Sequence, residues 1–513
     1  MSPGLVCWLL GIGLLLAGWQ LARRVADTPW RWSRALAVDA VLPLLIFTSL
    51  LALSARPLFA GVVSLAMGAG WARADRDKRR VLREPIVFSD IAQALDMLRH
   101  PKLALPFPNT GALAALALTA ITLFAALLLW EAPAWHGLPW LPVAVPPALV
   151  LLTRAAPGLP LSTFAQRLSL DPARDSARHG PFATILLYTL LAARERPARQ
   201  QGHVHAPGAE SARRPTAPTA AGGPVVLIQN ESFFDLRRLH PAIPRDLLPN
   251  FARCCAEAQQ WGRLAVPSWG ANTVRTEFAV LTGLSQQALG FDRFNPYLRF
   301  VSRPIASLAW TLRAEGYRTI CLHPFDRQFY RRDLAMPLLG FDEFLGEEQF
   351  ADAARINGYV ADIEVARVAE RLLREHGPKL FLFIITMENH GPWSGAARTD
   401  LANLPELGLS STEQQTLGQY AASLVNADSM LGLLSGALAR WPQPGVLGFY
   451  GDHLPSLPGV NSRLPLDEAH SDYLVWNSAL PAGGLRRDIA AEDLAAALVT
   501  ARRVRPYAVS AAA

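Results

Sequence analysis

Long apolar runs dominate the first third of the chain, whereas short apolar runs separated by polar stretches fill the remainder. A membrane-spanning helix needs about 20 predominantly apolar residues. Two of the candidate runs, 57–71 and 138–153, are short or rich in proline. Because the runs follow one another closely, they predict four or five membrane spans and not a single cleaved signal peptide. The runs lie at residues 5–21, 35–55, 57–71, 111–130 and 138–153.

The orientation of these spans stays open at the level of sequence. Arg23, Arg24, Arg31 and Arg34 follow the first run, and a second basic cluster lies within 73–83. The positive-inside rule places both clusters in the cytoplasm and the N-terminus outside. With the N-terminus outside, five spans leave the C-terminal region inside the cell and four spans leave it outside. Five spans with the N-terminus inside also place the C-terminal region outside, but they break the positive-inside rule.

Two further segments carry apolar residues at helical spacing. The segment 83–107 is either a helix along the membrane face or a polar loop, and 181–194 resembles an interfacial helix that ends in basic residues. Residues 195–223 are rich in Pro, Arg, Ala, Gly and Gln, a composition that predicts a flexible tether. We therefore expect a transmembrane domain at 1–155, an interfacial helix and linker at 156–223, and a catalytic domain at 224–513.

The C-terminal region alternates apolar strands with helical stretches. Helical patterns cover 360–376 and 411–439. Alternation of this kind predicts an α/β domain with a mostly parallel central sheet. The predicted strands are 225–229, 319–322, 380–386, 446–450 and 473–476.

Acidic residues follow two of these strands directly. Glu231 comes after the first strand, and Asp452 and His453 come after the strand at 446–450. Open α/β folds bind ligands at the carboxyl ends of their strands. Two carboxylates and an imidazole there are typical of a divalent-metal site. The alternative is a strand end followed by an exposed turn, which has the same sequence pattern.

A third polar group stands at the start of a predicted helix in 270–284, GANTVRTEFAVLTGL. A threonine hydroxyl at a helix N-terminus lies near the positive end of the helix dipole, where an anion is stabilised. Thr273 is therefore a candidate nucleophile. Simple N-capping by Thr273 or Thr276 is the alternative.

Charge and cysteine content narrow the function classes. The formal net charge is +7, and much of the excess flanks the apolar runs, which favours a membrane surface over nucleic acid as the partner. The four cysteines show no CxxC spacing, so no cysteine zinc site is indicated. A bridge between Cys321 and either Cys254 or Cys255 stays open.

Four motifs in order resemble the lipoteichoic acid synthase and phosphoglycerol transferase family of the sulfatase and alkaline phosphatase superfamily. They are Asn230-Glu231-Ser232, Gly270-x-x-Thr273-x-x-x-Glu277-Phe278, Asn389-His390 and Tyr450-Gly451-Asp452-His453. The resemblance implies one divalent cation, manganese in most members, with magnesium or zinc as alternatives. It implies that Glu231, Thr273, Asp452 and His453 hold this cation.

The resemblance also implies a reaction. Thr273 would attack the phosphorus of a phosphatidylglycerol headgroup, and the glycerol phosphate would pass to a glycan or polyol-phosphate acceptor outside the cytoplasmic membrane. The segment Phe329-Tyr330-Arg331-Arg332-Asp333 is similar to the family's headgroup-binding segment, although the family more often has Trp at the Tyr330 position. By that likeness Arg332 would contact phosphate, Tyr330 would pack against glycerol, and His390 would bind the headgroup or carry a proton.

Three other functions are compatible with parts of the pattern. A phosphoethanolamine transferase shares the metal-site plan, but typically adds more histidines and disulfides. A sulfatase-like hydrolase that uses formylglycine would need a Cys/Ser-x-Pro-x-Arg run, which does not occur around Thr273. A non-catalytic membrane sensor would have no need for the four intact ligand positions.

Overall fold

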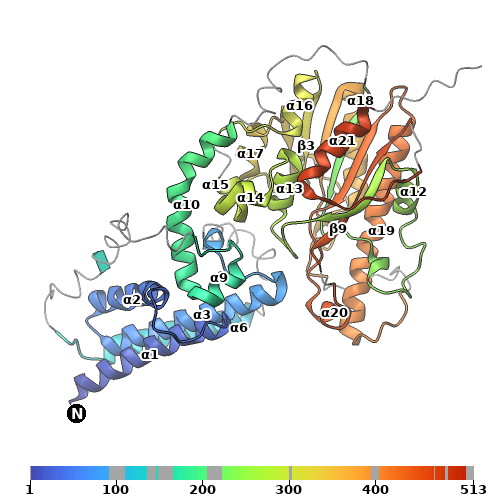
Figure 1. The fold of residues 1–513 in the computed structure, drawn as a ribbon. Coiled ribbons are helices and arrows are strands. Elements are labelled where there is room, and N and C mark those ends of the chain that lie inside the picture. Colours follow the sequence, from blue (N-terminus) through green and yellow to red (C-terminus); the bar gives the residue numbers. More distant parts are fainter. Residues whose placement is uncertain are drawn as a thin grey trace, which may run out of the picture. The chain divides into compact units, whose positions relative to one another are not determined.

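The computed structural model contains two compact units, Met1–Glu195 and Arg196–Ala513, which are described separately (Figure 1). The structure describes residues 2–91, 110–135, 146–147, 166–204, 222–299, 303–393, 404–466, 468–479 and 483–503. The apolar run predicted at 138–153 lies almost wholly outside these ranges, as does most of 83–107.

Four long helices form the main part of the described first unit: α1 (Pro3–Val25), α2 (Arg34–Ser54), α3 (Pro57–Leu82), whose second half is strongly charged, and α6 (Thr110–Trp130). Of these, α1 and α2 are long and apolar enough to cross a membrane. Large apolar side chains on their outer surfaces are exposed, including Leu9 and Leu53. An apolar exterior of this kind is typical of helices that contact lipid.

Glycines let α1 and α3 pack closely side by side. A Cβ atom added to Gly61 would lie 2.5 Å from the Cα atom of Gly11, and one added to Gly68 would lie 2.7 Å from the Cα atom of Gly18. Residue numbers rise together along the two helices, so α1 and α3 are parallel. Small residues at such crossings allow backbone contact between membrane helices.

Different segments of the chain form hydrogen bonds at the two ends of this helix bundle. At the end where α1 begins, the Glu131 carboxylate accepts hydrogen bonds from the Leu58 and Phe59 amides, so the end of α6 lies beside the start of α3. At the opposite end, the Thr28 hydroxyl donates to the Ser176 carbonyl, and Asp39 accepts from the Ala183 amide. Helices α9 (Pro172–His179) and α10 (Pro181–Val204) therefore begin where α1 ends.

Helix α10 corrects one prediction. It runs past Arg194 to Val204, whereas the composition of 195–223 predicts a flexible tether over this whole segment. Good helix formers such as Arg, Gln and Ala outnumber Pro197 and Gly202 in this extension, so the helix continues once the packed turns before it have nucleated it. Residues 205–221 of the predicted tether lie outside the described ranges.

The second unit is built on an eight-stranded sheet, and the predicted α/β fold with a mostly parallel sheet is confirmed. Strand β9 is the one that runs against its neighbours in this sheet. Sequence analysis missed the two- and three-residue edge strands β10 and β4, and also β2. The strand order is β10 (Ile489–Ala490), β2 (Gln260–Ala265), β9 (His470–Asn477), β8 (Val446–Gly451), β1 (Val225–Asn230), β7 (Leu380–Ile385), β3 (Arg318–Leu322) and β4 (Glu343–Leu345).

Helices cover both faces of this sheet (Figure 1). Successive side chains of β1 alternate between two hydrophobic cores: Val226 and Ile228 belong to one, and Val225 and Leu227 to the other. The first core includes α12 (Pro249–Glu257), α18 (Asp362–His376) and α19 (Ser411–Ala439). The second includes α13 (Thr273–Thr282), α16 (Leu308–Ala314), α17 (Arg332–Leu338) and α21 (Leu494–Arg503).

The remaining elements are short: α14 (Gln286–Leu289), α15 (Pro296–Arg299), α20 (Pro458–Arg463), and the hairpin of β5 (Arg355–Ile356) and β6 (Tyr359–Val360). Although α19 has the length and composition of a membrane span, 67% of its most apolar window is buried, and it packs in the core of this unit. All four cysteines are free thiols, so the bridge left open by the sequence is not present.

Candidate metal centre

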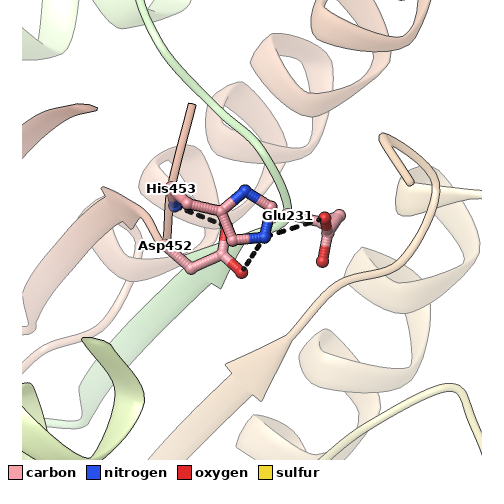
Figure 2. A group of neighbouring side chains, drawn as sticks. All are labelled: Glu231, Asp452 and His453. Carbon is pink, nitrogen blue, oxygen red and sulfur yellow. Dashed lines mark hydrogen bonds and ion pairs between the residues drawn. The ribbon is translucent and has the colours of Figure 1, made fainter. Parts of the chain in front are cut away.

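Two adjacent strand ends bring three metal-binding side chains together. Strands β1 and β8 are parallel neighbours in which Asn230 stands opposite Gly451, so Glu231 and Asp452 leave the sheet side by side. Glu231, Asp452 and His453 are all buried and present ligand atoms within 4.8 Å of one another (Figure 2). This is the cluster that the strand-end pattern predicts.

The backbone here requires glycine. A Cβ atom on Gly451 would lie only 1.9 Å from the Phe233 carbonyl oxygen, so the chain after β1 fits against β8 only because residue 451 has no side chain. The fit places the Ser232 amide 2.8 Å from Oδ1 of Asp452, to which it donates a hydrogen bond. The His453 amide donates to the same oxygen at 2.9 Å.

The second carboxylate oxygen of Asp452 is left for another ligand. Oδ2 is buried and has no hydrogen-bond partner within the described part of the chain. It lies 3.3 Å from Nε2 of His453, which is also 3.5 Å from Oε1 of Glu231 (Figure 2). A buried, unpartnered carboxylate oxygen is costly unless a cation or a donor completes it. Its environment therefore fits a bound cation.

The imidazole of His453 is oriented to act as a ligand. Nδ1 donates to the Leu454 carbonyl oxygen at 3.0 Å, because a carbonyl can only accept. This fixes the tautomer so that the Nε2 lone pair faces the two carboxylates. Metal-binding histidines commonly use such a hydrogen bond to set ring orientation.

The two carboxylates and the imidazole of the cluster shift one another's pKa values. Burial and the neighbouring Glu231 raise the pKa of Asp452 to about 7. Burial lowers the pKa of His453, but the Asp452 and Glu231 carboxylates outweigh this effect and raise it overall. Two buried carboxylates with an imidazole nitrogen suit a divalent cation such as Mn²⁺, Mg²⁺ or Zn²⁺.

Thr273 is the first residue of α13, and its hydroxyl reaches the same cluster. Oγ1 lies 3.5 Å from Nε2 of His453. Simple N-capping is wrong for both threonines: Asn272, in a left-handed conformation with φ of 65°, precedes the helix, and the Thr276 hydroxyl donates to the Asp452 carbonyl at 2.6 Å. All four predicted ligand side chains thus converge on one point.

Arg332 is also buried beside this region, but with a partner that sequence analysis missed. Its Nε and Nη2 atoms donate to the two carboxylate oxygens of Glu277 at 3.0 and 2.8 Å. The Tyr297 hydroxyl and the Gln229 amide donate to the same carboxylate. Glu277 was visible only as a motif position, and nothing in the sequence links it to a residue 55 positions away.

His323 completes the environment of Arg332. The Nη1 atom of Arg332 lies 3.3 Å from Nε2 of His323. Burial and the nearby guanidinium hold the pKa of His323 well below its usual value, so the ring is neutral and accepts from Arg332. The Tyr330 ring lies 5.4 Å from the guanidinium carbon. Burial raises the pKa of Tyr330 to about 12, and Glu231 and Asp452 are close enough to contribute.

His390 follows β7, the other neighbour of β1 in the sheet. Its Nδ1 atom is 2.7 Å from the Gly391 carbonyl and 3.3 Å from the Tyr359 hydroxyl. Burial, with a smaller contribution from Glu231, raises the pKa of Tyr359. His390 therefore borders the site through Tyr359, a residue that sequence analysis did not single out.

A buried network of polar side chains surrounds Asn230, the last residue of β1. The Asn230 side chain donates to Asp362 and Thr386, both at 3.0 Å, and accepts from Asn389 at 2.9 Å. The Glu388 carboxylate accepts from the Asp362 amide. Only Asn230 and Asn389 carried a sequence signal, as parts of the motifs beside Glu231 and His390.

Comparisons with known proteins agree with this architecture. The sulfatase family model matches residues 225–501. A capsular polysaccharide biosynthesis protein of Rhizobium meliloti (strain 1021) is 30% identical over 451 residues, which cover 84% of this chain and 79% of the relative.

Solved structures match the fold. The phosphoethanolamine transferase EptA of Neisseria meningitidis, an integral membrane protein, matches with a TM-score of 0.56 at 12% identity and covers 97% of this chain and 94% of its own. The Streptococcus pyogenes phosphoglycerol transferase GacH gives a TM-score of 0.47 at 22% identity over 60% of this chain and 82% of its own. Because the family model covers more than half of the chain, the chain belongs to the sulfatase family.

Proposed function

We propose that the protein is a metal-dependent phosphoglycerol transferase. It would move glycerol phosphate from phosphatidylglycerol to a glycan or polyol-phosphate acceptor. The observation that carries the proposal is the position of the Thr273 hydroxyl, 3.5 Å from Nε2 of His453 and beside the carboxylates of Glu231 and Asp452. A nucleophile at a helix N-terminus, facing a cluster that can hold a cation, suits phosphoryl transfer.

In the first step, Oγ1 of Thr273 would bond to phosphorus while the bond between phosphorus and the diacylglycerol oxygen breaks. Thr273 loses its proton, and the departing oxygen gains one. A bound divalent cation would lower the pKa of the Thr273 hydroxyl and offset the charge on the transferring group. In the second step, the acceptor hydroxyl oxygen would lose its proton and bond to phosphorus, while the bond between phosphorus and Oγ1 of Thr273 breaks and Oγ1 regains a proton.

Three further side chains would position the headgroup. Arg332, held by Glu277 and His323, presents a fixed guanidinium whose Nη1 can donate to a phosphate oxygen. Tyr330 would pack against the glycerol. His390 would bind the headgroup or carry the proton that the leaving oxygen gains.

The alternative donor is phosphatidylethanolamine. This alternative is supported by the fold match to EptA, a phosphoethanolamine transferase, which extends over both units. The four free cysteines differ from the disulfides expected of such enzymes, which favours the glycerol headgroup. A sulfatase-like hydrolase is the third candidate. The acceptor is proposed to be a glycan because the Rhizobium relative is named for polysaccharide biosynthesis.

We propose five membrane crossings with the N-terminus inside, because the contacts at the two ends of the first unit fit an odd number of crossings and the proposed reaction needs an external catalytic unit. The end of α6 lies beside the start of α3, whereas α9 lies beside the end of α1. Glu131 and Ser176 therefore lie at opposite ends of the first unit. The catalytic unit would then be outside, on the same side as the basic clusters, contrary to the positive-inside rule.

The proposal is tested with the full chain and headgroup-labelled lipids. Incubation with Mn²⁺ and phosphatidylglycerol should release diacylglycerol and add a phosphoglyceryl group to the Thr273 peptide, detected by mass spectrometry. Thr273→Ala should lose both products, and Thr282→Ala, on the same helix, should keep them. An adduct from phosphatidylethanolamine alone would favour the alternative donor. Hydrolysis of an aryl sulfate without either adduct would favour the hydrolase.

A further inference from the structure

The first unit contains a strongly basic cavity that the proposed reaction does not use. It has a volume of about 450 Å³, within the roughly 300–1,000 Å³ of ordinary ligand sites. It lies where α1 ends, α2 begins and α9 ends. Among its described lining residues none is acidic, and the charged or titratable ones are Arg23, Arg31, Arg34, Arg167, Arg178 and His179.

Two buried carboxylates near this cavity, those of Asp39 and Asp175, already have partners. Asp39 is bound by Arg23 at 2.7 Å and by the Trp19 ring nitrogen and the Ala183 amide. Asp175 accepts hydrogen bonds from Ser169, Leu170 and Tyr188. Within the described residues, the four arginines other than Arg23 form no ion pair, so their charges are available to a ligand. These four are Arg31, Arg34, Arg167 and Arg178.

Arg23 gives the cavity a fixed inner wall. Its side chain is 2% exposed, Nη1 donates to Asp39, and Nη2 donates to the Pro29 carbonyl. The third nitrogen, Nε, is buried without a hydrogen-bond partner in the part of the chain that the structure describes. Burying an N–H donor without an acceptor costs free energy. A tetrahedral anion would supply several acceptor oxygens.

The surroundings of the cavity are those of a membrane interface. Trp30 is 49% exposed and Trp32 is 99% exposed in the loop between the two spans. Tryptophan is enriched at the headgroup level of membranes. The apolar outer surfaces of α1 and α2 begin at the same loop, with Leu16 and Leu44 exposed on them. An anion that occupies the cavity could thus carry acyl chains along these helices.

We propose that this cavity binds the phosphate group of an anionic phospholipid headgroup. Guanidinium groups pair with phosphate oxygens through two parallel hydrogen bonds, which an ammonium group cannot reproduce. None of its lining residues belongs to the Thr273 centre, and the proposal does not depend on the reaction proposed there.

The test uses the full chain in nanodiscs of equal parts phosphatidylglycerol and phosphatidylcholine. Native mass spectrometry counts the phosphatidylglycerol molecules that the released protein retains. The pocket variant is Arg34→Gln with Arg178→Gln. The matched control is Arg24→Gln with Arg76→Gln, which removes the same charge from exposed residues of α1 and α3 that do not line the cavity. Arg34→Lys with Arg178→Lys keeps the charge without the paired donors. Thermal unfolding of each variant checks its fold.

Retention of phosphatidylglycerol should fall about tenfold or more in the pocket variant, and remain within about twofold in the control. The lysine variant should fall between them. If the pocket and control variants lose phosphatidylglycerol equally, the retention depends only on surface charge and the proposed site is wrong. Unchanged retention in a folded pocket variant would overturn it too. If the detergent-purified chain binds inorganic phosphate through Arg34 and Arg178 but retains no lipid, the ligand is a free anion and the lipid assignment is wrong.

Discussion

At the scale of single residues, the candidate metal centre depends on how each ligand is held. The Ser232 hydroxyl donates to Oε1 of Glu231 at 2.8 Å, and its amide donates to Asp452. Ser232 therefore orients both carboxylates of the candidate centre. Partners of this kind commonly contribute 10–100-fold to metal affinity.

A graded loss of metal affinity follows from this arrangement. Asp452→Asn removes a ligand charge and should weaken Mn²⁺ binding by more than the roughly 10–100-fold expected for Ser232→Ala. Isothermal titration of the full chain measures both. Asp488→Asn, at an exposed carboxylate, is the control and should bind like the wild type. Equal affinities for Asp452→Asn and the control would contradict the assignment of Asp452.

The buried pair of Arg332 and Glu277 makes a different prediction. Glu277→Gln leaves a buried guanidinium without its counter-ion and should destabilise the catalytic unit by about 3–5 kcal/mol. Glu375→Gln removes an exposed partner of Arg371 and should cost less than about 1 kcal/mol. Thermal unfolding of the full chain compares the two. Similar midpoints would mean that Glu277 does not balance Arg332.

At the scale of elements, parallel strands explain why the site could be predicted. Residues that follow neighbouring parallel strands meet at one edge of the sheet, so Glu231 and Asp452 could be matched from sequence alone. The partner of Arg332 could not, because it depends on how α13 and α17 pack. The edge strands β4 and β10 are too short to carry a periodic signal, and α10 continues through a composition typical of linkers.

The contact between α1 and α3 makes a prediction at this scale. Gly61→Leu would drive a side chain into the backbone at Gly11 and should destabilise the first unit by about 1–3 kcal/mol. Gly70→Leu on the same helix meets open space and should have little effect. Thermal unfolding in detergent measures both. Equal stability of the two variants would contradict the close contact of the helices.

At the scale of the whole molecule, two considerations disagree about which side of the membrane each part of the chain occupies. The lipid donor and glycan acceptor proposed here require an external catalytic unit, whereas the positive-inside rule would place the basic clusters inside. The five crossings with an internal N-terminus that we propose would meet the first requirement and place the basic clusters outside.

Cysteine labelling tests this topology in intact cells that carry Cys7→Ser. Trp32→Cys, at a fully exposed position beside the basic cavity, should react with a membrane-impermeant maleimide added from outside. Ser2→Cys at the opposite end should react only after the membrane is opened. The reverse pattern would place the basic clusters in the cytoplasm and contradict five crossings with an internal N-terminus.

The central claim is that the side chains of Glu231, Asp452 and His453 hold one cation against the hydroxyl oxygen of Thr273. An anomalous difference map at the manganese edge, from crystals of the full chain loaded with Mn²⁺, tests it most directly. The account predicts a single strong peak bounded by Glu231, Asp452, His453 and Oγ1 of Thr273. The absence of a peak there, or a peak bound by other residues, would contradict it.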